Sequence, residues 1–128
     1  MVLLSKGSDA QQVKQCNKIY RNPDNVAEYS LGQQGLMDYI NRELVPLVGN
    51  CMSRDKTEIS SLTMTLTIDQ TGQIIDATVD KPYMSKTCKV ELKRKMLTMK
   101  GWKPATKKSN PICSYYPFVI SCFYLEQD

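Results

Sequence analysis

The chain has 128 residues, of which 41% are hydrophobic, and it carries a net charge of +4. This length suits one domain with its own core, and so mild a charge does not by itself indicate a nucleic-acid-binding protein. The sequence contains no histidine, which excludes Ser-His and Cys-His nucleophile pairs and every metal site that uses histidine. No apolar run approaches the ~20 residues that a membrane helix needs, so we expect no membrane span in this chain.

The N-terminus matches the end of a secretory signal. A short apolar run at residues 2–4 precedes Ser8 and Ala10, the small-x-small pattern that comes before a cleavage site. We interpret residues 1–10 as the remnant of a signal peptide or as a frayed N-terminus, and we expect a periplasmic or secreted protein. Residues 11–28 show no clear period, and we predict an extended arm or short helix that leads into the domain.

The five cysteines contain no Cys-x-x-Cys pair, so a structural zinc site is not indicated. In an exported protein we expect one or two disulfides, with one cysteine left over. The fold predicted below brings Cys51, Cys88 and Cys122 to one side of the domain. We predict at least one disulfide among these three.

The clearest local pattern is a β-hairpin at residues 62–79. From Leu62 to Asp69, apolar residues alternate with threonine and aspartate, as in a half-buried strand. Gly72 can supply the positive φ of a tight turn, and Asp69 can hydrogen-bond the turn backbone. In the second strand, strict alternation places Ile75, Ala77 and Val79 on one face and Ile74, Asp76 and Thr78 on the other.

A first helix is predicted before the hairpin, from Gln33 to Val45. Apolar residues recur there at helical spacing. Ser30 is a suitable N-cap, and Pro46 is expected to end the helix. The polar residues 49–58 then indicate a loop.

A second helix is predicted after the hairpin, from about Thr87 to Lys100, with Gly101 as its left-handed C-terminal cap. The lysines of this helix are interpreted mainly as a solvated face. Nucleic-acid binding is the weaker alternative, because the helix lacks interleaved aromatic residues. The expected core stripe is Cys88, Leu92, Met96 and Met99, and the lysines of the weaker alternative are Lys89, Lys93, Lys95, Lys100, Lys103, Lys107 and Lys108.

The last element is predicted to be a long strand, from Ile112 to Leu125. Pro117 cannot donate to a ladder, so this strand should lie at a sheet edge. A crossover from the second strand to the third then gives the strand order 2-1-3. We therefore predict an α+β two-layer sandwich, α-β-β-α-β, with a three-stranded antiparallel or mixed sheet and two helices on one face. The core-facing residues of the last strand should be Tyr116, Phe118, Ile120 and Cys122.

Four stretches occur in the order and spacing of one known family. They are Tyr29-Ser30-Leu31-Gly32 with Leu36-Met37, Asp69-x-x-Gly72 with Ile74, Met99-x-x-Trp102-Lys103-Pro104-Ala105, and Pro117-x-x-Ile120. Together they resemble the C-terminal domain of TonB, in the form common in envelope proteins of Bacteroidetes. The stretch with Trp102-Lys103-Pro104 is the most specific. Residues 29–128 would form this domain, after an N-terminal arm at 11–28.

The resemblance implies a non-enzymatic protein of the cell envelope. Such a domain binds an extended peptide segment of a partner protein, which in TonB-dependent transport belongs to an outer-membrane receptor. The sequence departs from the family at Val45-Pro46, where the family has Tyr-Pro, and at Ile59-Ser60-Ser61, where it has a glycine. The family's membrane anchor and Pro-rich spacer are also missing, so we expect no transmission of force from the inner membrane.

No catalytic residue, cofactor or metal site is expected. Cys113 would need an activating base to act as a nucleophile, and no histidine exists to serve. The alternative to peptide binding is a stand-alone structural or accessory domain that keeps the fold. Such a domain would bind or dimerise through its helix or arm surfaces.

The predicted partner-binding site is the free edge of the last strand. Backbone groups of successive residues point to opposite sides of a strand. If the missing donor of Pro117 lies on the free side, then Tyr115, Val119, Ser121 and Phe123 also present their backbones there. A partner strand could add along this edge. The alternative is that Pro117 blunts the edge against aggregation.

Overall fold

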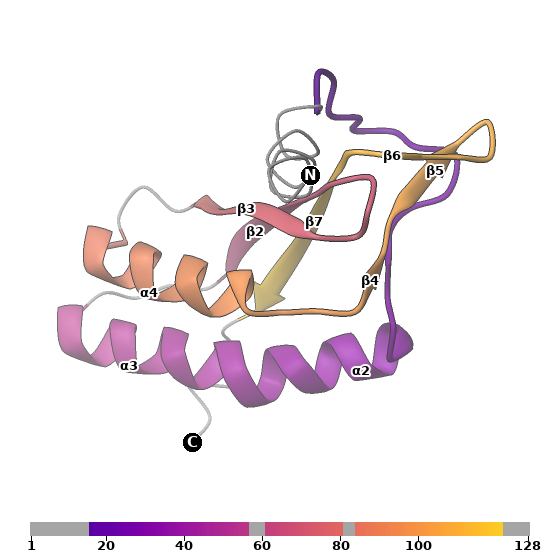
Figure 1. Ribbon diagram of the computed structural model, residues 1–128. Coiled ribbons are helices and arrows are strands. Elements are labelled where there is room, and N and C mark those ends of the chain that lie inside the picture. Colours follow the sequence, from indigo (N-terminus) through magenta and orange to yellow (C-terminus); the bar gives the residue numbers. More distant parts are fainter. Residues whose placement is uncertain (1–15, 57–60, 81–83, 122–128) are drawn as a thin grey trace, which may run out of the picture.

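The computed structural model describes residues 16–56, 61–80 and 84–121 (Figure 1). Its elements are β1 (Glu28–Tyr29), α2 (Gly32–Tyr39), the π-helical segment η1 (Ile40–Leu44), α3 (Val45–Asp55), β2 (Ser61–Ile68), β3 (Ile74–Asp80), α4 (Lys86–Leu97), β4 (Trp102–Lys103), β5 (Ala105–Lys107), β6 (Asn110–Ile112) and β7 (Ser114–Ser121).

The main sheet has the order β3-β2-β7, and both pairings are antiparallel. The helices α2, α3 and α4 lie on one side of this sheet (Figure 1). This arrangement confirms the predicted α+β sandwich and its 2-1-3 strand order. Among the described helices, none has the length and apolar character that a membrane crossing requires.

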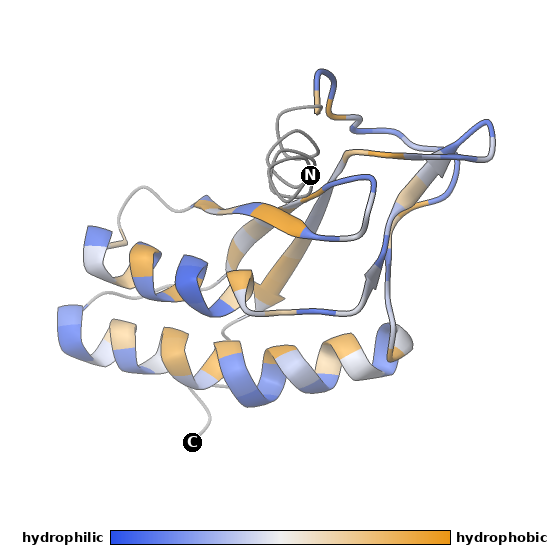
Figure 2. Ribbon diagram, in the orientation of Figure 1, coloured by the Kyte–Doolittle hydropathy of each residue, from blue (hydrophilic) through white to orange (hydrophobic). Residues whose placement is uncertain are grey.

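The central strand β2 supplies much of the core. Leu62, Met64, Leu66 and Ile68 are all buried under the helices, and Figure 2 shows apolar residues on the helices and strands that face each other. The β2–β3 register shifts, so that Thr67 pairs with Asp76 but Ile68 pairs with Ile74. This bulge turns Ile74 into the core and breaks the strict alternation. The prediction that Ile74 shares the outer face with Asp76 and Thr78 is therefore wrong.

The turn of the hairpin is held by Asp69, as predicted. Its Oδ1 accepts hydrogen bonds from the Thr71 amide at 2.9 Å, the Thr71 hydroxyl at 2.6 Å and the Gln73 amide at 3.0 Å. Gly72 has a φ of +89°, and a Cβ at this position would collide with the carbonyl oxygen of Trp102. The glycine is thus required both by the turn and by the close approach of β4.

Substituting Gly72 with alanine should destabilise the protein by about 2 kcal/mol or more. A left-handed backbone alone costs a residue with a Cβ roughly 1–2 kcal/mol, and the collision with Trp102 adds to this cost. Gly32→Ala is the matched control, because Gly32 also has a positive φ of +74° but nothing lies within 4 Å of its Cβ position. Urea denaturation should show the larger loss for Gly72→Ala. Equal losses would mean that β4 does not press on the turn.

The first helix does not end at Pro46, so the predicted end is wrong. Helical structure runs through α2, η1 and α3 as far as Asp55. In the π-helical segment, the Val45 amide bonds to the Ile40 carbonyl, five residues back. The wider turn places Pro46 in the first turn of α3, where a missing N–H costs little. The predicted loop at 49–58 is accordingly helix up to Asp55, and residues 57–58 lie outside the described residues.

The N-cap prediction for this helix is also wrong. The N-cap residue is Leu31, and it makes no side-chain capping bond. Ser30 instead donates its backbone N–H to the Gly101 carbonyl at 2.8 Å. It therefore ties the start of α2 to the segment that precedes β4.

The second helix, α4, has its predicted core stripe. Cys88, Leu92 and Met96 are fully buried, and Met99 is buried just beyond the helix. Ser85 is the N-cap, and its hydroxyl accepts from the Cys88 amide at 3.2 Å. The helix ends at Leu97 with Thr98 as C-cap. Gly101 has the expected positive φ of +87°, but the prediction that it caps the helix is wrong.

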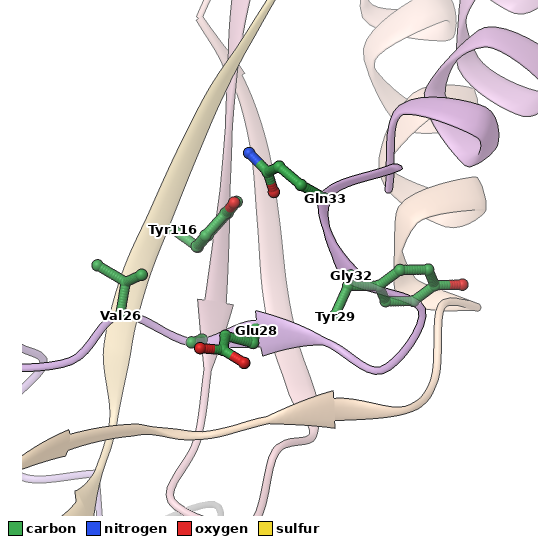
Figure 3. A pocket seen from close by; sticks show the side chains of 7 residues that line it. Val26, Glu28, Tyr29, Gly32, Gln33 and Tyr116 are labelled. Carbon is green, nitrogen blue, oxygen red and sulfur yellow. The ribbon is translucent and has the colours of Figure 1, made fainter. Parts of the chain in front are cut away.

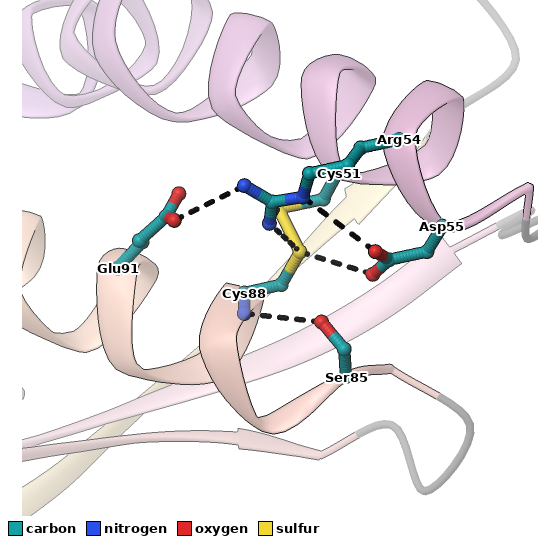
Figure 4. The surroundings of a disulfide bond; sticks show 6 residues. All are labelled: Cys51, Arg54, Asp55, Ser85, Cys88 and Glu91. Atoms are coloured by element: carbon teal, nitrogen blue, oxygen red, sulfur yellow. Dashed lines mark hydrogen bonds and ion pairs between the residues drawn. A yellow bond between two sulfur atoms is a disulfide. The ribbon is translucent and has the colours of Figure 1, made fainter.

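A disulfide between Cys51 and Cys88 joins α3 to α4 (Figure 4). This bond confirms the prediction of at least one disulfide among Cys51, Cys88 and Cys122; the last of these lies outside the described residues. The Arg54 guanidinium covers the bond, with Nη2 2.8 Å from Cys88 Sγ. Arg54 also pairs with the carboxylates of Asp55 at 3.6 Å and Glu91 at 3.3 Å.

A second disulfide, Cys16–Cys113, was not predicted as a pair. It ties the N-terminal arm to the residue before β7. Farther along the arm, Asn25 and Thr106 of β5 exchange backbone hydrogen bonds at 3.0 and 3.1 Å. The Lys108 amide also donates to the Asp24 carboxylate at 2.8 Å. The arm is thus fixed along the β5–β6 hairpin.

Candidate functional site

The strand β7 forms one edge of the main sheet and pairs with β2 on its inner side. It begins at Ser114 rather than Ile112, because Ile112 belongs to the short β5–β6 hairpin. The predicted site residue Phe123, and with it the predicted end of the strand at 122–125, lies outside the described residues. The described part of the predicted site therefore runs from Tyr115 to Ser121.

The side chains of β7 alternate as predicted. Ile120 is buried, and Tyr116 and Phe118 are half-buried against the core. On the opposite face Pro117, Val119 and Ser121 are exposed, with 64% of Val119 accessible, and Tyr115 is half-buried. The described site residues thus share the face of the sheet that the helices leave uncovered.

The backbone direction of β7 follows from its bonds to the arm. Tyr20 donates to the Cys113 carbonyl at 2.9 Å and accepts from the Tyr115 amide at 3.0 Å. The groups of Cys113 and Tyr115 therefore point away from β2. Because backbone direction alternates along a strand, the groups of Pro117 and Val119 also point outward. The missing donor of Pro117 thus lies on the open side, in agreement with the sequence-based expectation.

The arm covers only the first part of this edge. Its bonds with Tyr20 occupy the outward N–H of Tyr115, and the Arg21 guanidinium lies 4.6 Å from the centre of the Tyr115 ring. Farther along, the described part of the chain places no strand beside Pro117 and Val119. The open edge consists of these two residues, with the carbonyl of Pro117 and both backbone groups of Val119.

A pocket of about 360 Å³ lies beside the open edge (Figure 3). Tyr116 points from β7 toward Gln33 at the start of α2, and Val26 of the arm lines the same pocket. The pocket is therefore a gap between β7 and the segment that carries β1. Its described lining residues are Val26, Ala27, Glu28, Tyr29, Gly32, Gln33 and Tyr116.

Two of the lining residues, Tyr29 and Tyr116, contact the Trp102 ring. The Trp102 ring centre lies 5.4 Å from that of Tyr29 and 4.9 Å from that of Tyr116. The pairing of Tyr29 with Trp102 in β1–β4 fixes this cluster through the backbone as well. The two tyrosines are thus held in place before any ligand binds.

Sequence reasoning did not find the pocket. Its two walls are far apart in sequence, and β1, which carries Glu28 and Tyr29, is only two residues long. One signal was present, an apolar Val26 that follows the mainly polar residues 21–25 of the arm. The structure leaves 60% of this side chain exposed.

Lysines of the weaker nucleic-acid alternative take part in ion pairs. Lys93 lies 2.9 Å from Asp76, Lys95 lies 3.2 Å from Glu43, and Lys107 lies 3.9 Å from Asp24. These carboxylates offset charge that phosphate groups would otherwise attract. The pairs favour the interpretation of a solvated face.

Comparisons of the chain with protein-family models, with curated proteins and with solved structures gave no match.

Proposed function

We propose that this protein is a non-enzymatic peptide-binding module that captures an extended segment of a partner protein by strand addition at β7. One observation carries the proposal, the outward direction of the Pro117 and Val119 backbones. An added strand can bond to Val119 and to the Pro117 carbonyl while the inner ladder between β7 and β2 stays complete. Main-chain bonds of this kind provide affinity in strand addition.

The compartment that fits this proposal is an oxidising one, the periplasm or the cell exterior. Two disulfides stabilise the fold, and such bonds persist mainly outside reducing compartments. The resemblance to the TonB C-terminal domain supports the same location. The proposed partner is an extended segment of an envelope protein, and more specifically of an outer-membrane receptor.

Val119→Pro tests the proposal, because it removes the outward N–H of the open edge. Phe118 and Ile120 keep the inner ladder, so the fold should survive, as thermal unfolding would show. Linear peptides selected from a random displayed library on the wild-type protein serve as probes. We expect them to bind Val119→Pro at least about tenfold more weakly, roughly the contribution of one net hydrogen bond.

Val119→Ala is the matched control, since it shortens the same side chain and keeps the N–H. Its affinity for the selected peptides should stay within about threefold of wild type. Bound peptide should also slow hydrogen exchange of the Val119 amide. If Val119→Pro binds the peptides as wild type does, strand addition at β7 is wrong. A library that yields no binder would favour an edge that Pro117 blunts.

The alternative, an accessory domain that binds through its helices, has one observation in its favour. Leu31 before α2 is 69% exposed and Met37 on α2 is 48% exposed. A second copy packed on the N-terminal part of α2 would cover exposed apolar side chains of this kind. Sedimentation velocity of the wild type and of a Leu31→Ser/Met37→Ser variant distinguishes the accessory domain that dimerises from the peptide-binding module. A dimer that the double substitution dissociates would support the alternative.

A further inference from the structure

We infer that the pocket beside Tyr116 is a specificity subsite that receives one large apolar side chain of an extended peptide added to β7. This inference rests on the proposed strand addition and defines the ligand that it would select. The pocket lies against the same strand as the open edge, because Tyr116 lines it and the next residue, Pro117, begins the edge.

The geometry of a sheet sends a peptide side chain toward this pocket. In an added strand, alternate side chains point to the face on which Tyr116 and Phe118 lie. On that face, beyond Tyr116, the neighbouring space is the gap toward Gln33 and Gly32 (Figure 3). A side chain that leaves the added strand at this level therefore enters the pocket, while its sequence neighbours point to the opposite face.

The size and lining of the pocket favour an aromatic or long aliphatic group. A volume of about 360 Å³ is near the lower end of small-ligand pockets, which span about 300–1,000 Å³, so the pocket suits one side chain. Tyr29, Tyr116, Ala27 and the exposed Val26 supply the apolar part of the lining. Because Trp102 supports both rings, binding requires little additional ordering of the walls.

The pocket also carries a negative charge. Of the described lining residues, Glu28 is the charged one. Lys103 lies opposite it in the β1–β4 register. The Glu28 carboxylate nevertheless makes no ion pair within the described part of the chain. Glu28 is exposed, so its effect on a ligand is a modest preference for positive charge. The inferred ligand is an extended segment with one large apolar residue beside a lysine or arginine.

The test compares two valine substitutions in library selection. Val26→Glu places a charge on the pocket wall at a position that is 60% exposed, so the fold should tolerate it. Val90→Glu is the matched control, because Val90 is 43% exposed on α4 and does not line this pocket. Wild type and Val90→Glu should select peptides with an aromatic or long aliphatic residue at one fixed position. Val26→Glu should lose that preference.

A double-mutant cycle then measures the energetic coupling between the pocket and the apolar residue of the peptide. Replacing the selected apolar residue of one library peptide with alanine should weaken binding to wild type and Val90→Glu about tenfold or more. The same change should weaken binding to Val26→Glu less than about threefold. The single tryptophan provides a second readout, because the apolar peptide should shift Trp102 fluorescence and its alanine form should not.

The outcomes separate the subsite from the strand addition on which it rests. Two results would overturn the subsite and leave strand addition standing. In the first, the selected peptides depend on the Val119 amide but show no apolar preference. In the second, the alanine change in the peptide weakens binding equally to wild type, Val90→Glu and Val26→Glu. Peptides that depend on Val26 but bind Val119→Pro normally would overturn strand addition instead. The inference stands if the selected peptides require both the amide and the pocket wall.

Discussion

Replacing Trp102 with alanine should lower the free energy of unfolding by about 3–5 kcal/mol, the usual range for a truncated core tryptophan. The indole is only 6% exposed and lies against the rings of Tyr29 and Tyr116. Its removal would leave a cavity where β1, β4 and β7 meet. Urea denaturation monitored by circular dichroism measures the loss.

Trp102→Phe is the control that separates volume from hydrogen bonding. The indole Nε1 is buried and has no hydrogen-bond partner among the described residues. A phenylalanine therefore loses no hydrogen bond there, and the variant should lose only about 1–2 kcal/mol for the smaller ring. A loss below about 1 kcal/mol for Trp102→Ala would contradict a structural role for the cluster. Equal losses for both variants would show that the polar atom matters.

Removal of the Cys16–Cys113 disulfide, by alanine at both positions, should cost about 2–4 kcal/mol. The bond closes a loop across a sequence separation of 97, and a cross-link of this length restricts the unfolded chain strongly. The second disulfide lies inside this loop and already shortens it, which keeps the expected cost below the ~4.7 kcal/mol of a simple 100-residue loop. Chemical denaturation under non-reducing conditions measures the difference.

The matched control for this variant is Cys51→Ala/Cys88→Ala, which removes a bond of sequence separation 37. The shorter loop should give a smaller entropic loss. The two variants should also differ locally, because only the first frees the arm from β7. Hydrogen exchange of the Tyr115 amide should accelerate in Cys16→Ala/Cys113→Ala and stay slow in the control. Slow exchange in both would show that the Tyr20 bonds hold the arm without the disulfide.

The parts of the fold that the sequence predicted are those with a regular period. The alternation from Leu62 to Asp69 gave the central strand, and the helical spacing from Cys88 to Met96 gave the stripe of α4. Pro117 placed the last strand at an edge because a proline is tolerated only where no ladder bond is lost. In each case one physical requirement acts over several residues, so the pattern is visible without tertiary contacts.

The errors arose where tertiary packing replaced a local rule. Pro46 would normally end a helix. Here the π-helical segment Ile40–Leu44 places it in the first turn of α3, where its missing N–H costs little. A single bulge reversed the face of Ile74. The short strands β1, β4, β5 and β6 have two or three residues each, which is too few for a period to be read.

The candidate site was only partly accessible to sequence reasoning. The open edge at Pro117 and Val119 follows from strand alternation, which the sequence displays. The pocket depends on where the arm runs, and the arm is positioned by Cys16–Cys113 and by backbone bonds to β5 and β7. A single cysteine and a few backbone hydrogen bonds leave no periodic pattern in the sequence of the arm. The position of Val26 beside Tyr116 was therefore not predictable.

The Cys16–Cys113 bond has a mechanical consequence. Tension applied to the chain at Cys16 crosses the disulfide to Cys113 and enters β7 directly, so residues 17–112 carry no load along their backbone. If a partner strand were bonded to Val119, this tension would act parallel to both strands. The hydrogen bonds between the two strands would then be loaded together, in shear. Under stretching in a single-molecule instrument, the oxidised protein should gain no contour length from the helices or the β2–β3 hairpin. Reduction of the bond would place those elements in series with the applied force.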